Sequence, residues 1–177
     1  GEVGDVAGRV SDRLAEDRAR LHVDELLEGR RVAVIGSGSS AIQSIPVIAE
    51  QAAQLTVFQR TPNFSIPSRN RPMDDEYEQG WKRDYAGLRQ QARMMRTGIL
   101  YGLSDTPAMS VSAEERKAEY EKRWAAGGTA FMGSFRDLLL DQAANDTAAE
   151  FVRGKIRETV KDPTTAEKLC PRNHPIG

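Results

Sequence analysis

The sequence has a single cysteine, Cys170, no long apolar run and no excess of either charge. One cysteine excludes a disulfide within the chain and fits a reducing compartment, so we expect a cytoplasmic protein. The longest apolar runs, such as residues 32–35, are far shorter than the ~20 residues that cross a bilayer, so no membrane span is expected. The 25 Lys and Arg balance 26 Asp and Glu. This balance argues against a protein that binds nucleic acid or an anionic membrane.

The length and composition fit a folded domain. The chain has 177 residues, of which 39% are hydrophobic and 29% charged. This is enough for one domain, or for one domain with an inserted subdomain. The chain begins with Gly, and no signal-peptide pattern is visible, so we expect a partial chain. Residues 1–29 are polar and highly charged, and they are interpreted as a leader that is either a surface helix or disordered.

The pattern changes abruptly at Arg30. Residues 32–35 (VAVI) form a short β-branched run, which is typical of a strand buried on both faces. A glycine turn follows, then an apolar-periodic helix that contains Pro46, then a second strand at 55–58 (LTVF). A strand, glycine turn, helix and strand within about 30 residues predict a βαβ unit with a right-handed crossover. We assign this unit to residues 30–61.

The glycine turn has the pattern G-x-G-x-x-A, with Gly36, Gly38 and Ala41 at the three small positions. Between a strand and a helix, this pattern is typical of a turn that binds the pyrophosphate of a dinucleotide. Nearby side chains can add hydrogen bonds to phosphate oxygens. The alternative is a tight turn without a ligand. The predicted cofactor-binding residues here are Gly36, Ser37, Gly38, Ser39, Ser40 and Gln43.

The end of the second strand indicates which dinucleotide is bound. An NAD site needs a carboxylate there to hold the ribose 2′-hydroxyl, but no acid lies between Glu50 and Asp74. Arg60 can instead form a bidentate pair with a 2′-phosphate, beside the hydroxyl of Thr61. The sequence therefore favours NADPH. The alternative is that Arg60 is only a solvated strand end.

Helices are predicted over the rest of the chain, at about 74–97, 113–126, 129–142, 147–161 and 163–169. Ser112 with Glu115, and Thr147 with Glu150, have capping-box spacing, while Asp162-Pro163 is typical of a helix start. Two parallel strands cannot form a covered sheet alone, so we expect further strands outside this chain. The predicted fold is α/β: a partial Rossmann-like βαβ unit with a large helical insertion over 62–173, and a return toward the same domain at 174–177.

At this point the sequence resembles Baeyer–Villiger monooxygenases, the class B flavin-dependent enzymes of the cyclohexanone and phenylacetone monooxygenase type. The resemblance covers about residues 29–177, and it is carried by GRRVAVIGSGSSAIQSIPVIAEQAAQLTVFQRTPNFSIPSRNRP (29–72), KRWAAGG (122–128), FRDLLLD (135–141), AAEFVRGKIRETVKDP (148–163) and LCPRNHPIG (169–177). The family fingerprint Phe-x-Gly-x-x-x-His-x-x-x-Trp is not found, since residues 1–29 contain His22 without the matching glycine and tryptophan.

The resemblance implies a reaction and its cofactors. In this family NADPH reduces FAD, the reduced flavin reacts with O2, and one oxygen is inserted into a ketone to give an ester or lactone. FAD and the catalytic arginine are expected outside this chain, so we expect no catalytic residue here and no activity of the chain alone. The partners implied are a ketone, O2 and the FAD domain of the same polypeptide. Another two-dinucleotide flavoprotein that oxidises nitrogen or sulfur, and a noncatalytic helical binding module, remain alternatives. No metal site is expected.

Overall fold

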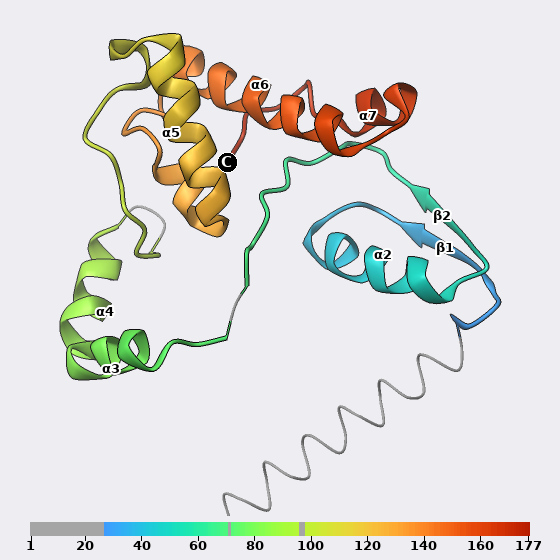
Figure 1. Ribbon diagram of the computed structural model, residues 1–177, viewed down its shortest axis with the longest axis horizontal. Helices are drawn as coiled ribbons and strands as arrows, with labels where there is room; N and C mark the ends of the chain where they lie inside the picture. Colours follow the sequence, from blue (N-terminus) through green and yellow to red (C-terminus); the bar gives the residue numbers. More distant parts are fainter. Residues whose placement is uncertain (1–26, 71, 96–97) are drawn as a thin grey trace, which may run out of the picture. The chain divides into compact units, whose positions relative to one another are not determined.

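The computed structural model describes residues 27–70, 72–95 and 98–177. The chain divides into two compact units, the first ending at Asn63 and the second spanning Phe64–Gly177. The order of their elements along the chain can be followed by colour (Figure 1). Each unit has its own local packing.

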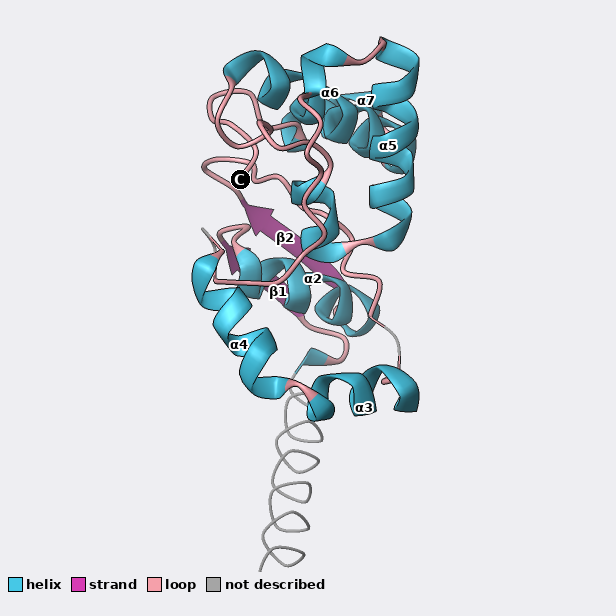
Figure 2. Ribbon diagram, turned by 90° about the vertical axis from the view of Figure 1, so that its left-hand side faces the viewer, coloured by secondary structure: helices cyan, strands magenta, loops and turns pink. Residues whose placement is uncertain are grey.

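The first unit contains strand β1 (Arg31–Ile35), helix α2 (Ser39–Gln51) and strand β2 (Gln54–Phe58). The two strands pair in parallel, with Arg31 opposite Gln54 and Ile35 opposite Phe58. Helix α2 connects them and packs against both strands, as Figure 2 shows. Pro46 lies inside α2, as the sequence indicated. Both strands and the helix between them are therefore confirmed.

The strands of the first unit are not covered on both faces by described residues. Neither β1 nor β2 has a buried residue, and α2 has none either. The side chain of Ile35 is 88% exposed and that of Phe58 is 57% exposed. Apolar side chains of this kind are normally buried in a parallel sheet. The described residues thus form a mixed α/β arrangement with a two-stranded parallel sheet.

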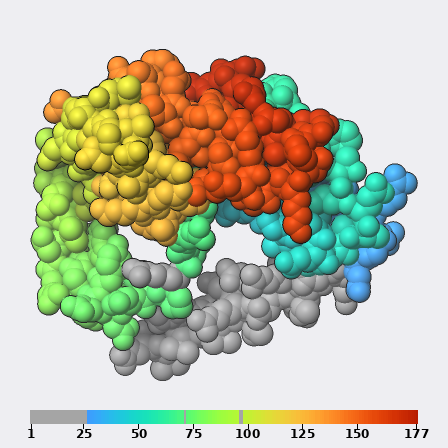
Figure 3. All heavy atoms as spheres, turned by 45° about the horizontal axis from the view of Figure 1, so that its top comes forward, coloured from blue at the N-terminus to red at the C-terminus, as the bar shows by residue number. Residues whose placement is uncertain are grey.

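The second unit is helical and holds the buried core. Its main helices are α5 (Ala113–Ala126), α6 (Gln142–Thr159) and α7 (Pro163–Leu169), with short 3-10 helices η1 (Ala108–Ser110) and η2 (Gly128–Gly133). Tyr120 of α5 packs among aromatic rings, with centroids 5.5 Å from Phe131 and 5.3 Å from Phe151. Figure 3 shows the atoms of α5, α6 and α7 packed together on one face of this unit.

Two of the predicted helix starts are confirmed by their caps. The Ser112 hydroxyl accepts from the backbone N–H of Glu115, and the Glu115 carboxylate accepts from the backbone N–H of Ser112, which completes a capping box. At α7, the Asp162 carboxylate accepts from the backbone N–H of Thr165, with Pro163 as the first helical residue. These caps are local, so sequence spacing is enough to predict them.

The predicted cap at Thr147 is wrong. Helix α6 begins five residues earlier, at Gln142, and Asp141 is the residue that caps it. Thr147 lies inside the helix, where its hydroxyl donates to the Ala144 carbonyl at 2.7 Å and also bonds the Tyr120 hydroxyl. Ala144 and Asn145, in the first turn of α6, are buried. Packing of this first turn into the core extends the helix beyond the start that Thr147 suggested.

Two further helix predictions differ from the structure. The single helix expected at 74–97 is two helices, α3 (Asp75–Arg83) and α4 (Tyr85–Met94), because Asp84 leaves helical geometry and its carboxylate caps α4 at the Gly87 N–H. The helix expected at 129–142 is the 3-10 helix η2 followed by turns. Gly127, just before η2, and Gly128, its first residue, have positive φ, at 78° and 59°, which ends α5 and redirects the chain.

Candidate functional site

The glycine turn lies at the carboxyl end of β1, against the carboxyl end of β2. The backbone N–H of Gly36 donates to the Phe58 carbonyl at 2.8 Å, which extends the strand pairing into the turn. Gly36 has φ of 101°, a conformation that L side chains rarely adopt. A Cβ at Gly36 or Gly38 would meet no atom within 4 Å. Gly36 therefore serves backbone geometry, and both glycines leave open space beside the turn.

The segment after β2 holds the turn in place. The Ser37 hydroxyl donates to the Thr61 carbonyl at 3.4 Å, and the Asn63 side-chain amide donates to the Ser37 carbonyl at 3.2 Å. Asn63 was not among the residues predicted from the sequence. The sequence around Asn63 shows no pattern that predicts this contact. The contact forms only because the segment after β2 folds back against the glycine turn.

Helix α2 starts directly after the turn. Its N-cap, Gly38, is extended (φ −76°, ψ −176°) and makes no side-chain cap, while the Gly38 carbonyl accepts the first helical hydrogen bond from Ile42 at 2.9 Å. Ser39 and Ser40 are exposed in the first turn, and the Gln43 amide donates to the Ser39 carbonyl at 3.0 Å. The first N–H groups of a helix lack partners within it. At α2, the N–H groups of residues 39–41 have no backbone acceptor among the described residues, so they can donate to an external one.

Arg60 lies two residues beyond Phe58, at the same edge as the turn. Its side chain is exposed, and it forms no hydrogen bond or ion pair with another residue that the structure describes. Thr61 is also exposed, and its carbonyl is bonded to the turn as described above. Because β1 and β2 are parallel, their carboxyl ends meet at one edge. A guanidinium free to pair with an anion is therefore placed near the glycine turn.

The structure brings the eight predicted residues together along this edge. Three form the turn (Gly36, Ser37, Gly38), three lie in the first turns of α2 (Ser39, Ser40, Gln43), and two follow β2 (Arg60, Thr61). Such an edge offers backbone N–H groups, hydroxyls and one guanidinium, and no carboxylate stands between Glu50 and Asp74. Its chemistry suits an anionic ligand that carries more than one phosphate group.

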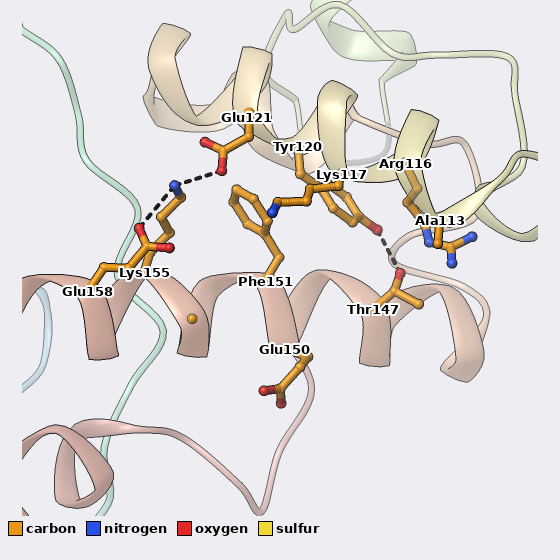
Figure 4. Close-up of a pocket in the computed structure, with 11 residues that line it drawn as sticks. Ala113, Arg116, Lys117, Tyr120, Glu121, Thr147, Glu150, Phe151, Lys155 and Glu158 are labelled. Atoms are coloured by element: carbon orange, nitrogen blue, oxygen red, sulfur yellow. Dashed lines mark hydrogen bonds and ion pairs between the residues drawn. The ribbon is translucent and has the colours of Figure 1, made fainter. Parts of the chain in front are cut away.

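A separate groove of about 290 Å³ lies between α5 and α6, in the helical unit. None of the eight residues lines it. Figure 4 shows Lys155 between Glu121 and Glu158, at 2.8 and 3.2 Å, and the Tyr120 hydroxyl 2.8 Å from Thr147. The Lys155–Glu121 and Tyr120–Thr147 contacts join α5 to α6, while the Lys155–Glu158 pair lies within α6, so we interpret the groove as part of the helix packing. Among residues 27–70, 72–95 and 98–177, no cluster of His, Cys, Asp or Glu could hold a metal ion. No described helix is long and apolar enough to cross a membrane.

The chain is similar to several characterised monooxygenases, although no family model matches it. It is 43% identical over 150 residues to phenazine N-monooxygenase of Lysobacter antibioticus, covering 84% of this chain and 28% of that protein. It is also 43% identical over 154 residues to cyclohexanone 1,2-monooxygenase of an Acinetobacter species, covering 85% of this chain and 28% of that protein. The chain thus spans less than a third of the length of these relatives.

Solved structures give the same result. An oxidised steroid monooxygenase bound to NADP matches with a TM-score of 0.76 and 51% identity, over 85% of this chain and 29% of that one. The structure of OTEMO in complex with FAD and NADP matches with a TM-score of 0.80 and 40% identity, over 85% of this chain and 28% of that one. These likenesses confirm the predicted resemblance: over most of its length this chain is similar to a segment of Baeyer–Villiger and cyclohexanone-type monooxygenases, and structures of such relatives have been solved with NADP or with FAD and NADP bound.

Proposed function

We propose that this chain is the NADPH-binding portion of an FAD-dependent Baeyer–Villiger monooxygenase. The observation that carries the proposal is the position of Arg60, exposed at the end of β2 beside an open glycine turn. A second phosphate site at this place distinguishes NADPH from NADH. The likeness to structures that contain NADP supports the same cofactor.

The residues of the turn and of Arg60 would hold different parts of the nucleotide. The N–H groups at the start of α2 and the hydroxyls of Ser39 and Ser40 fit a pyrophosphate, because a helix N-terminus attracts anions. Arg60 fits the 2′-phosphate, and the hydroxyl of Thr61 can donate beside it. A charge-assisted hydrogen bond of this kind contributes about 1.5–3 kcal/mol. Ser37 has a positioning role, since its hydroxyl and carbonyl are bonded to the segment after β2.

We propose further that the helical unit is an insertion into a Rossmann-like dinucleotide domain. Phe64 begins this unit and His174 is close to its last residue, yet their rings are in edge contact with centroids 5.5 Å apart. A segment inserted into another domain must enter and leave at neighbouring points, so this contact supports the proposal. The uncovered strands of the first unit are consistent with further strands from the same polypeptide.

In the complete enzyme, NADPH would supply a hydride to FAD, and both cofactors would support insertion of oxygen into a ketone. The balance is one ketone, one O2, one NADPH and one proton giving one ester or lactone, one NADP+ and one water. This chain contributes the nucleotide-holding residues. The FAD site, the ketone site and the groups that contact the reacting atoms would belong to other parts of the polypeptide.

Oxidation of a nitrogen atom is a second candidate reaction. Phenazine N-monooxygenase and cyclohexanone 1,2-monooxygenase are equally similar to this chain, each at 43% identity. The nucleotide-binding edge is compatible with either reaction, because it would contact NADPH and not the substrate. The product, and not the cofactor preference, separates the two candidates.

The test uses the complete polypeptide that contains this chain, purified with FAD. We expect oxidation of NADPH that depends on O2, together with an ester or lactone formed from a cyclic ketone, detected by mass spectrometry. An N-oxide formed from a phenazine, with ketones unchanged, would favour the second candidate. Absence of NADPH binding in the flavin-loaded protein would contradict both and favour the noncatalytic binding module.

A further inference from the structure

Asn145 is a buried polar residue whose side chain is bonded to the last residues of the chain. It is 5% exposed, in the first turn of α6. Its amide nitrogen donates to the Ile176 carbonyl at 2.9 Å and to the Leu138 carbonyl at 3.0 Å, while its amide oxygen accepts from the Ile176 N–H at 3.0 Å. The side chain thus pairs with Ile176 on both its N–H and its carbonyl, as a neighbouring strand would.

Other contacts hold the same segment in place. Ile176 is 1% exposed and belongs to the hydrophobic core, and the Arg153 guanidinium donates to the Pro171 carbonyl at 2.7 Å. Gly177 has φ of 104°, and a Cβ there would overlap Cδ2 of Leu139. Hydrogen bonds and packing at Pro171, Ile176 and Gly177 therefore set the direction in which the backbone leaves the helical unit.

This direction matters for a dinucleotide site. The glycine turn and Arg60 would hold the pyrophosphate and the adenosine end, which are only part of the ligand. In dinucleotide domains a second half of the sheet completes the site around the other end of the nucleotide. If the helical unit is an insertion, the second half of the sheet follows Gly177. The segment bonded to Asn145 then leads directly into that half and sets where it starts.

We propose that Asn145 is a positioning residue for hydride transfer, acting through the backbone of Ile176 on the polypeptide that follows. The inference rests on the proposed function. It assigns to Asn145 an effect on turnover that is separate from nucleotide affinity, because the residues proposed to bind the pyrophosphate and the 2′-phosphate lie in the first unit. A displacement of about 1 Å in a reacting group can reduce a rate by up to about a hundredfold.

The experiment compares Asn145→Leu with Phe131→Leu in the complete, flavin-loaded enzyme. Asn145→Leu removes the bonds to Ile176 while keeping a side chain of similar size. Phe131→Leu weakens the same core from η2 and leaves those bonds intact, so it is the control for lost stability. We expect Asn145→Leu to lower kcat and the rate of flavin reduction by about tenfold or more, with KM for NADPH within about twofold of wild type. Phe131→Leu should lower the melting temperature without this change in kcat.

A second variant keeps the test decisive if Asn145→Leu does not fold. Gly177→Ala disturbs the same segment at an exposed position, through its positive φ and the contact with Leu139. It should give the same pattern, a lower kcat with KM for NADPH unchanged. The inference would be overturned, with the proposed function intact, if Phe131→Leu changed kcat and KM as much as Asn145→Leu and Gly177→Ala do. Loss of NADPH binding by the wild-type protein would instead contradict the proposed function.

Discussion

The hydroxyl of Ser37 donates to the carbonyl of Thr61 at 3.4 Å, so the glycine turn is joined to the residue after Arg60. The Asn63 amide adds a second bond, to the Ser37 carbonyl. The residues proposed for the pyrophosphate and those proposed for the 2′-phosphate are thereby connected at one edge. A change on either side of this connection is expected to affect a single nucleotide site.

Replacing Arg60 with Gln should discriminate between the two nicotinamide nucleotides. The variant loses a charged partner for the 2′-phosphate, so NADPH affinity should fall about tenfold to a hundredfold, while NADH affinity should change little. Dissociation constants for both nucleotides, measured by titration of the complete enzyme, check this. Arg30→Gln is the matched control, since Arg30 is also exposed but lies before β1, at the opposite end of the strands. Equal losses for NADPH and NADH in Arg60→Gln would remove the assignment.

Substitution of Gly36 by Ala should weaken both nucleotides together. The backbone at Gly36 has φ of 101°, and an L side chain there costs about 1–3 kcal/mol of strain. The turn would shift to relieve this strain, so NADPH and NADH affinities should decrease by similar factors. Gly80→Ala is the control, because Gly80 lies in helix α3 without a positive φ and a Cβ there meets no atom within 4 Å. If Gly36→Ala bound both nucleotides as wild type does, the turn would not be a phosphate-binding element.

Removal of the Ser112 hydroxyl should destabilise the helical unit. Ser112→Ala breaks the cap of α5, where the hydroxyl accepts from the Glu115 N–H at 3.2 Å, and should lower the free energy of unfolding by about 1 kcal/mol. Denaturant unfolding monitored by far-UV circular dichroism measures this change. Ser112→Thr keeps a capping hydroxyl and should retain most of the stability. A full loss in the Thr variant would mean that the effect comes from packing and not from capping.

The ion pairs between α6 and α7 should make stability depend on pH. The Arg157 guanidinium, with that of Arg172, lowers the pKa of the Glu167 carboxyl below its ordinary value of 4.5. A carboxyl with a lowered pKa in the folded state contributes stability above its unfolded pKa, and this contribution is lost as the pH falls through the folded pKa. Glu167→Gln should therefore lower the melting temperature at pH 7 and have little effect at a pH well below 4.5.

A pH series of melting temperatures for wild type and Glu167→Gln provides the measurement. Asp105→Asn is the control, since Asp105 is exposed and forms no ion pair with another described residue. The melting temperature of Asp105→Asn should stay close to that of the wild type at every pH of the series, because the ion pairs of Glu167 are intact in both. If the difference in melting temperature between wild type and Glu167→Gln stayed the same at acid pH, the contribution of Glu167 to stability would not be electrostatic.

Much of the local structure could be predicted because its causes lie within a few residues. The runs VAVI and LTVF predict strands from their β-branched side chains, and the structure has β1 and β2 there. Ser112 and Glu115 predict the start of α5, because a capping box needs only a spacing of three residues. Pro163 after Asp162 predicts the start of α7 for a similar reason.

The predictions that failed depended on contacts between distant residues. Thr147 and Glu150 have capping-box spacing, but the first turn of α6 is buried in the core and Asp141 caps it instead. Asn63 and Asn145 carried no recognisable signal, since their partners Ser37 and Ile176 are 26 and 31 residues away. Side-chain amides pair with any backbone that the fold brings near them, so their partners cannot be derived from sequence spacing.

By itself, the sequence determined the strands, the glycine turn between them, the basic residue after the second strand and the bounds of α5 and α7, because each follows from local geometry and side-chain chemistry. Tertiary structure alone decided that Thr61 and Asn63 hold the turn, that α6 starts at Gln142, and that Ile176 is bonded to Asn145. The physical reason is that these features depend on burial and on hydrogen bonds between segments that meet only when the chain folds.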